Sequence, residues 1–356
     1  MRLTLEPWAP EYDTSLHTQA GMEVGAVALG FDAVDLHCEL EVWQPVQTSR
    51  VNIQFSRLYF IDGRRRLEAK VFAQWEESGN THSAPGLLGT YSVGLAELET
   101  NGKAQIIEAN PSRVLILGSQ LEHPGLRIPA LGNQLGHLDY EAHGIKDDGN
   151  QENQLEQTLQ NLMRSHEKKL ARDLDLGDDL LILDGTLPLE QAFDGSLGYV
   201  KTLHDLRLPP REQRVLFALL QQQRSPIFKI GERRYSWFLR LAQPVEWHQG
   251  LSGVVRLEVY SDRGFEWAQK VADWTCQNLP RLAAKSFRDP RAPQQLMPVA
   301  FLEAEMGRRM GDIGIVRRRI QAFLQAEFLR EREGAQLDSG RALEQASLFE
   351  TSRGLN

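Results

Sequence analysis

Cysteine is scarce in this sequence of 356 residues, which has only Cys38 and Cys276. The two lie far apart and belong to no CxxC or Cys/His spacing, so the sequence indicates neither a disulfide framework nor a zinc site. None of the nine histidines forms an HExxH motif or another paired ligand spacing. We therefore expect both cysteines to be small buried side chains and the chemistry to depend on other residue types.

Long apolar runs and the familiar phosphate-binding motifs are also missing. No apolar run reaches the roughly 18 residues of a membrane-spanning helix, and the first residues lack the apolar core of a signal peptide. There is no GxSxG nucleophile elbow, no Walker A loop and no GxGxxG after a predicted strand. These absences predict a cytoplasmic protein without membrane contact that does not itself hydrolyse ATP.

An excess of positive charge is absent as well. The chain has 40 Lys and Arg against 48 Asp and Glu, a formal net charge of −8. Non-specific attraction to nucleic acid scales with the phosphates that a protein neutralises, so indiscriminate attachment is excluded while a local basic groove is not. Arg64–Arg66 and Arg317–Arg319 are the triplets that could line such a groove, although a charge run is more often a solvated face.

Hydrophobic patterning predicts an α/β protein with a mixed β-sheet flanked by helices. Alternation over 34–43 predicts a half-buried strand, and the apolar run at 58–61 begins a hairpin over 57–75 with its turn at 62–66. Further strands are expected at 86–98, 105–108, 114–118, 180–184, 195–202, 227–230, 235–241 and 253–260. Helices are expected at 155–174, 209–222, 265–284, 299–310 and 313–330.

The predicted organisation is one large domain with insertions and closing helices. We expect residues 1–50 to form an N-terminal arm and a first strand, residues 51–330 the main domain, and residues 331–356 a mobile polar tail. Within the main domain, residues 119–150 are rich in Gly, Pro, His and Asp and predict a long exposed loop.

Two of the apolar runs end in the same dipeptide. Residues 58–61 are followed by Asp62 and glycine, and residues 180–183 by Asp184 and glycine. An Asp before Gly at a strand end is more often a turn former than a ligand. A buried carboxylate is costly without a cation beside it, and a metal ion is the simplest such cation. The repetition after matching runs favours a carboxylate cluster at one edge of a sheet.

Glu167 and Lys201 are further candidates for that site. Glu167 lies one helical turn from Met163 and from Leu170, on the inward side of its predicted helix. Carboxylate oxygens suit Mg²⁺ or Mn²⁺, and these ions act mainly on phosphates, so phosphodiester hydrolysis fits the set. Lys201 follows a predicted strand and could face a scissile phosphate, while the alternative is an ordinary surface lysine.

Taken together in their order and spacing, these segments resemble the NurA nucleases, a family that pairs with the hexameric HerA-type DNA translocase in DNA end processing. The resemblance covers most of the chain, and no single motif decides it. The segments that carry it are 5–8 with Tyr12, 60–63, 65–69, the helix of Glu167, 183–187, 199–201 and 255–258.

The resemblance implies an RNase H-like sheet, a ring- or cradle-shaped homodimer and DNA cleavage that depends on Mn²⁺ or Mg²⁺. It places Asp62, Glu167 and Asp184 as ligands of two metal ions. It also suggests that Arg65 and Arg66, which fall in a matching segment, bind DNA.

One departure from the family pattern concerns the C-terminal helices. Many members have a Tyr and a His eight residues apart, where this sequence has Met297 and Glu305. Glu305 is therefore a candidate fourth oxygen ligand, although Glu303 and Glu305 could equally be exposed helix residues.

The leading hypothesis is a metal-dependent DNA nuclease acting on single strands and duplex ends in end resection and repair, with a HerA-type motor supplied in trans. One alternative is a catalytically inactive subunit that docks on a translocase and channels DNA, which predicts acids that do not converge. A second is an RNase H-like enzyme acting on RNA or hybrids, which competition between substrates would separate. A nucleotide phosphohydrolase acting on free triphosphates is a third.

Overall fold

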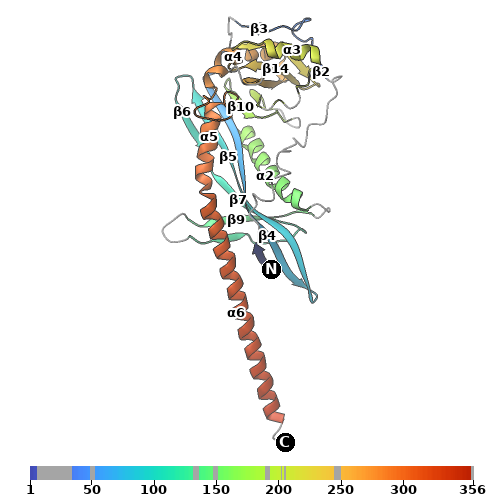
Figure 1. The fold of residues 1–356 in the computed structure, drawn as a ribbon, viewed down its shortest axis with the longest axis vertical. Helices are drawn as coiled ribbons and strands as arrows, with labels where there is room; N and C mark the ends of the chain where they lie inside the picture. The colour runs from blue at the N-terminus through green and yellow to red at the C-terminus, as the bar shows by residue number, and fades with distance from the viewer. Residues whose placement is uncertain are drawn as a thin grey trace.

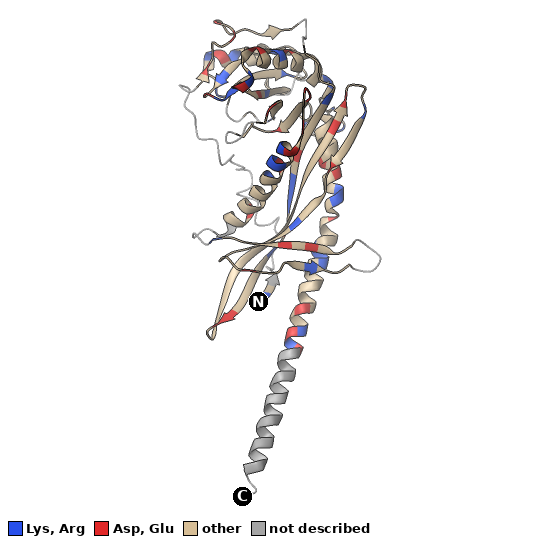
Figure 2. Ribbon diagram, turned by 180° about the vertical axis from the view of Figure 1, so that it is seen from behind, with Lys and Arg blue, Asp and Glu red and all other residues tan. Residues whose placement is uncertain are grey.

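The computed structural model describes residues 1–5, 34–48, 53–130, 136–146, 151–188, 193–201, 203, 206–243 and 250–353. Their strands join into one mixed sheet with helices on its faces, in agreement with the predicted α/β class (Figure 1). Among these residues no helix is both long and apolar enough to cross a membrane. Acidic and basic residues are interspersed over the elements (Figure 2).

The longest strands form one hairpin at the centre of the molecule. β4 (Arg57–Glu77) pairs antiparallel with β5 (Asn80–Glu99) along its whole length. The predicted turn at 62–66 is wrong, because these residues stay extended and pair with residues 90–94. The chain reverses instead at Ser78 and Gly79, whose φ angles of 54° and 79° supply the left-handed backbone of a tight turn.

The strands beside this hairpin place the two Asp-Gly sequences next to each other. β10 (Leu180–Asp184) is parallel to β4, with Leu183 opposite Ile61, and β11 (Ser196–Val200) is parallel to β10. Beyond β11 the order continues antiparallel through β15 (Val254–Tyr260), β14 (Arg234–Arg240) and β13 (Phe228–Ile230). All five were predicted as strands, with ends that differ by a few residues.

On the other side of the hairpin, the structure corrects the predicted loop at 119–150. β5 pairs with β6 (Ala104–Glu108) and β7 (Pro111–Leu117). β9 (Leu138–Gly144) then adds to β7 in parallel, and β8 (Leu126–Ile128) adds to β9. Leu138 and Tyr140 are buried. Their alternation with polar residues is the strand signal that the Gly- and Pro-rich composition of the flanks concealed.

Different helices cover the two faces of β4, so alternate residues of this strand pack against different helices. Phe60 packs in the same core as Leu302 and Met306 of α5 (Met297–Met310), where α4 (Phe265–Leu282) also lies. Ile61 instead packs in the core to which Met163 of α2 (Gln151–Asp173) belongs. Because side chains alternate along a strand, Asp62 faces α5 and Gly63 faces α2. The two helices lie on either side of the hairpin (Figure 1).

At the N-terminal end, the predicted strand at 34–43 is much shorter. β1 (Arg2–Leu5) pairs with β4, and β2 (Val34–Asp35) ends after two residues. The Asp35 side chain accepts a hydrogen bond from the backbone N–H of His37 at 3.0 Å, a local turn that competes with the sheet ladder. β3 (Val46–Gln47) follows. Most of the expected N-terminal arm, residues 6–33, lies outside the described residues.

Two helices differ from the predicted lengths. α3 (Pro210–Ala218) ends earlier than expected, and β12 (Gln223–Arg224) follows it. α6 runs over Ile313–Arg353, through most of the segment expected to be an irregular tail, and projects away from the sheet (Figure 1).

The two cysteines are unpaired thiols. Cys276 is buried, as expected, whereas Cys38 is partly exposed. Burial raises the pKa of Cys38 to about 11 and that of Cys276 to about 12, so both stay protonated and poorly nucleophilic at neutral pH.

Candidate metal centre

Three acids from three separate elements meet where β10 ends beside β4. Asp62 directly follows the part of β4 that pairs with β10, Asp184 ends β10, and Glu303 lies on α5 over the same face. One carboxylate oxygen from each of the three lies within 4.8 Å of the others. We call these residues the acidic cluster. Their distances would allow the three side chains to share a cation.

Asp62 is the most enclosed member of the acidic cluster, with 8% of its surface exposed. Its Oδ1 accepts a hydrogen bond from the N–H of Gly63 at 2.9 Å, while its buried Oδ2 has no hydrogen-bond partner among the described residues. Burial, aided by the charges of Asp184 and Glu303, raises the pKa of Asp62 well above its usual value. An enclosed oxygen of this kind is costly to leave without a proton or a cation.

Two cations neutralise the other members of the acidic cluster. The Lys201 amine lies 2.6 Å from Asp184 Oδ2 and also donates to Gln295 Oε1 at 2.8 Å. Arg291 donates through both terminal nitrogens to the two carboxylate oxygens of Glu303. Burial raises the pKa of Glu303, but the Arg291 hydrogen bonds outweigh it and leave the pKa below its usual value. Asp62 has no such ion-pair partner in the described structure, so it is the member that needs either a proton or a bound cation.

Glu167 approaches the same edge from the opposite face and lies outside the acidic cluster. Its carboxylate rests on the backbone of Gly63, where an added Cβ would come 2.1 Å from Glu167 Oε1 and 2.9 Å from Met163. Gly63 is therefore required for close packing of α2, and not for the turn that its sequence suggested. The third place beside Asp62 and Asp184, expected for Glu167, is taken by Glu303.

Burial of Glu167 makes a pH-dependent contribution to stability. Burial is the main cause that raises its pKa from 4.5 to about 7. The folded chain thus holds this proton more tightly than the unfolded chain, so stability is lost as the pH rises from 4.5 through 7. We expect Glu167→Gln to relieve this loss, by up to about 3 kcal/mol above pH 7. Urea unfolding at a series of pH values, without added metal, measures it.

The matched control is Glu122→Gln, because Glu122 is exposed. It should unfold in parallel with the unaltered chain at every pH. A Glu167→Gln profile that is also parallel to the unaltered chain would contradict the assignment.

Three other candidate residues are engaged elsewhere or face away. Glu305 accepts hydrogen bonds from Arg308 and Arg309 at 2.7 Å each, so both its oxygens are occupied outside the acidic cluster. Arg66 donates to the carbonyl of Gly311 at 2.7 Å and so caps the C-terminal end of α5. Arg65 is exposed and, by the alternation along β4, lies on the α2 face.

Sequence reasoning left open whether Glu303 or Glu305 takes the place of the family's histidine, chose Glu305 as the candidate ligand, and missed Arg291 and Gln295 altogether. A signal for Glu303 existed, because Val299, Leu302 and Met306 form the apolar stripe of α5 and Glu303 directly adjoins Leu302. Arg291 and Gln295 lie in the connection between α4 and α5, where no periodicity marks the direction of a side chain.

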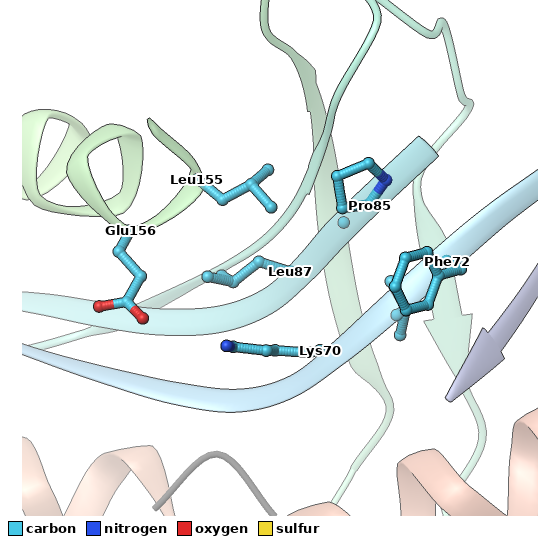
Figure 3. Close-up of a pocket in the computed structure, with 8 residues that line it drawn as sticks. Lys70, Phe72, Pro85, Leu87, Leu155 and Glu156 are labelled. Atoms are coloured by element: carbon cyan, nitrogen blue, oxygen red, sulfur yellow. The ribbon is translucent and has the colours of Figure 1, made fainter. Parts of the chain in front are cut away.

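A separate pocket lies farther along the hairpin, between β4, β5 and the first turns of α2 (Figure 3). Apolar side chains line most of it, with Lys70 and Glu156 at one side. No residue of the acidic cluster lines this pocket, so it is separate from the candidate metal centre.

Comparisons with known proteins give little further guidance. No family model and no curated protein matches the sequence. The crystal structure of the NurA nuclease from Sulfolobus solfataricus aligns over 81% of this chain and 88% of its own, with 11% sequence identity and a TM-score of 0.40. At this TM-score the alignment supports no conclusion about the fold or the function of this chain. The functional proposal below depends on the geometry of the site.

Proposed function

We propose that this protein is a metal-dependent nuclease that hydrolyses phosphodiester bonds at the acidic cluster. The observation that carries the proposal is the buried Asp62 Oδ2, which has no hydrogen-bond partner in the described structure and lies beside Asp184 and Glu303. A set made only of carboxylate oxygens suits Mg²⁺ or Mn²⁺. The donor set therefore fits the ion that the sequence resemblance implies.

Asp62, Asp184 and Glu303 would hold the first ion, and Glu167, which approaches across Gly63, remains a candidate for a second. A bound ion would supply Lewis-acid stabilisation of a phosphate and a more acidic water. Lys201 contributes a positive charge that is held in place at the same edge, since its amine contacts Asp184 and Gln295 and its side chain is only 19% exposed. In this proposal the lysine binds a non-bridging phosphate oxygen of the substrate.

The finer parts of the proposal depend on the sequence resemblance. They are an RNase H-like sheet, DNA as substrate in single strands and duplex ends, a homodimer, a HerA-type translocase as partner, and a role in end resection. The net charge of −8 fits a nuclease to which a motor delivers DNA, because such a nuclease needs little non-specific affinity of its own.

The geometry favours an active enzyme over the inactive docking subunit. That alternative predicts that the predicted acids do not converge. Asp62 and Asp184 do converge, with Glu303 in the place expected for Glu167, and the three lie within 4.8 Å of one another. An enzyme acting on RNA or hybrids would use the same acids and ions, so only substrate competition separates it from a deoxyribonuclease.

Cleavage of labelled single-stranded and blunt duplex DNA tests the proposal directly. We expect the purified chain to cut DNA with Mn²⁺ or Mg²⁺ and to lose all cutting in chelator, with unlabelled RNA competing poorly. No cutting with either ion, also after addition of a HerA-type translocase, would refute the nuclease and leave the channelling subunit.

A further inference from the structure

Next to the acidic cluster lies a cation that the sequence placed in a basic triplet but did not assign to DNA binding, as it did the two arginines that follow. Arg64 follows Asp62 by two residues on β4, so both side chains are on the α5 face. Its Nη1 donates to the backbone carbonyl of Glu303 at 3.2 Å. Among the described residues this is the only hydrogen bond of the guanidinium, and Arg64 is exposed to solvent.

The helix α5 carries no side chain at the position where it meets this guanidinium. Gly307 lies one helical turn after Glu303, and an added Cβ there would come 2.9 Å from Arg64 Nη1 and 3.2 Å from its Cζ. The absence of a side chain at position 307 lets the guanidinium lie against the helix backbone. Arg64 is thereby held beside the acidic cluster with most of its donors directed to solvent.

No described strand covers the edge of β4 beside Arg64, although Arg317 of α6 donates to the backbone carbonyls of Leu67 and Glu68 farther along it. Pairing of β4 with β10 ends at Ile61 opposite Leu183, and pairing with β1 begins only at Val71. Residues 62–70 therefore pair with β5 alone among the described strands. A chain that reaches the acidic cluster along this edge passes Arg64.

We propose that Arg64 binds a backbone phosphate of the nucleic acid that neighbours the phosphate at the acidic cluster. This inference depends on the proposed nuclease function and adds a substrate contact to it. Three carboxylates repel a polyanion, so a binding path past them needs a cation. A planar guanidinium matches two phosphate oxygens at once, which the point charge of a lysine does not. The nearby Arg66 is engaged at the end of α5 and cannot serve in the same way.

The test is binding of a fluorescein-labelled oligothymidylate, measured by anisotropy in chelator at a series of salt concentrations. We expect Arg64→Ala to weaken binding about tenfold and to reduce the slope of log K against log salt by about 0.7, the value for one phosphate contact on a single strand. Arg64→Lys should keep the slope and lose part of the affinity. Gly307→Ala should weaken binding although Arg64 remains.

The matched control is Arg127→Ala, which removes another exposed arginine from β8, far along the sheet from the acidic cluster. It should bind as the unaltered chain does. If Arg64→Ala and Arg127→Ala bind alike while the unaltered chain cuts DNA, the Arg64 contact is refuted and the nuclease stands. Absence of both binding and metal-dependent cutting in the unaltered chain would overturn both.

Discussion

Asp62→Asn is expected to reduce metal-dependent DNA cleavage by about a thousandfold or more. The substitution keeps the size of the side chain and removes the one buried carboxylate of the acidic cluster whose Oδ2 has no partner in the described structure. A bound ion stabilises the transition state by several kcal/mol, and each 1.4 kcal/mol corresponds to about tenfold in rate. Initial rates on labelled single-stranded DNA with saturating Mn²⁺ measure the loss.

The matched control is Asp139→Asn on β9, where the side chain is 65% exposed. It should cut at the rate of the unaltered chain. Cleavage that survives Asp62→Asn in a chain with unchanged circular dichroism would show that the reaction occurs at another site or comes from a contaminant.

The same substitution is expected to stabilise the protein when no metal is present. Burial raises the pKa of Asp62, so the folded chain holds that proton more tightly than the unfolded chain and loses stability as the pH rises through the raised pKa. Asparagine carries no charge at any pH. We expect Asp62→Asn to add about 1 to 3 kcal/mol to the free energy of unfolding at pH 8 in chelator. Urea denaturation measures the difference.

The gain should narrow as the pH falls and disappear below 3.8, where Asp62 is protonated in both the folded and the unfolded state. Added Mn²⁺ should raise the melting temperature of the unaltered chain and leave that of Asp62→Asn nearly unchanged, because a ligand stabilises only the state that binds it. A variant that is less stable than the unaltered chain at pH 8 without metal would contradict the claim that Asp62 is an uncompensated buried charge.

Much of the fold was predictable because the spacing of apolar residues along the chain indicates which side chains are buried. The runs at 58–61 and 180–183 have no polar interruption, as expected for strands covered on both faces, and they became adjacent parallel strands. The length of β4 was not predictable from the same signal. Asp62, Gly63 and three arginines interrupt the apolar pattern, yet these residues stay extended because β5 supplies an antiparallel partner for each.

The site was only partly predictable, because its third acid depends on how a distant helix packs. Asp62 and Asp184 share a motif, and the motif alone suggested that they belong together. Glu303 has no motif, and its position follows from Leu302, which packs tightly over Gly94, where an added Cβ would come 2.5 Å from Leu302. Such a contact between residues far apart in the chain leaves no trace in local composition, which is why Glu167 was predicted as the third acid and Glu305 as a candidate fourth ligand.

The ribosome adds the three residues of the acidic cluster at widely separated times during translation. A growing chain displays Asp62 and Asp184 long before α5 leaves the ribosome, and Glu303 is added only when more than four fifths of the 356 residues have been made. The acidic cluster is therefore incomplete in any chain that ends before Glu303. If the protein is a nuclease, nascent and prematurely terminated chains carry no complete cutting site, and translation itself delays activity until the molecule is nearly whole.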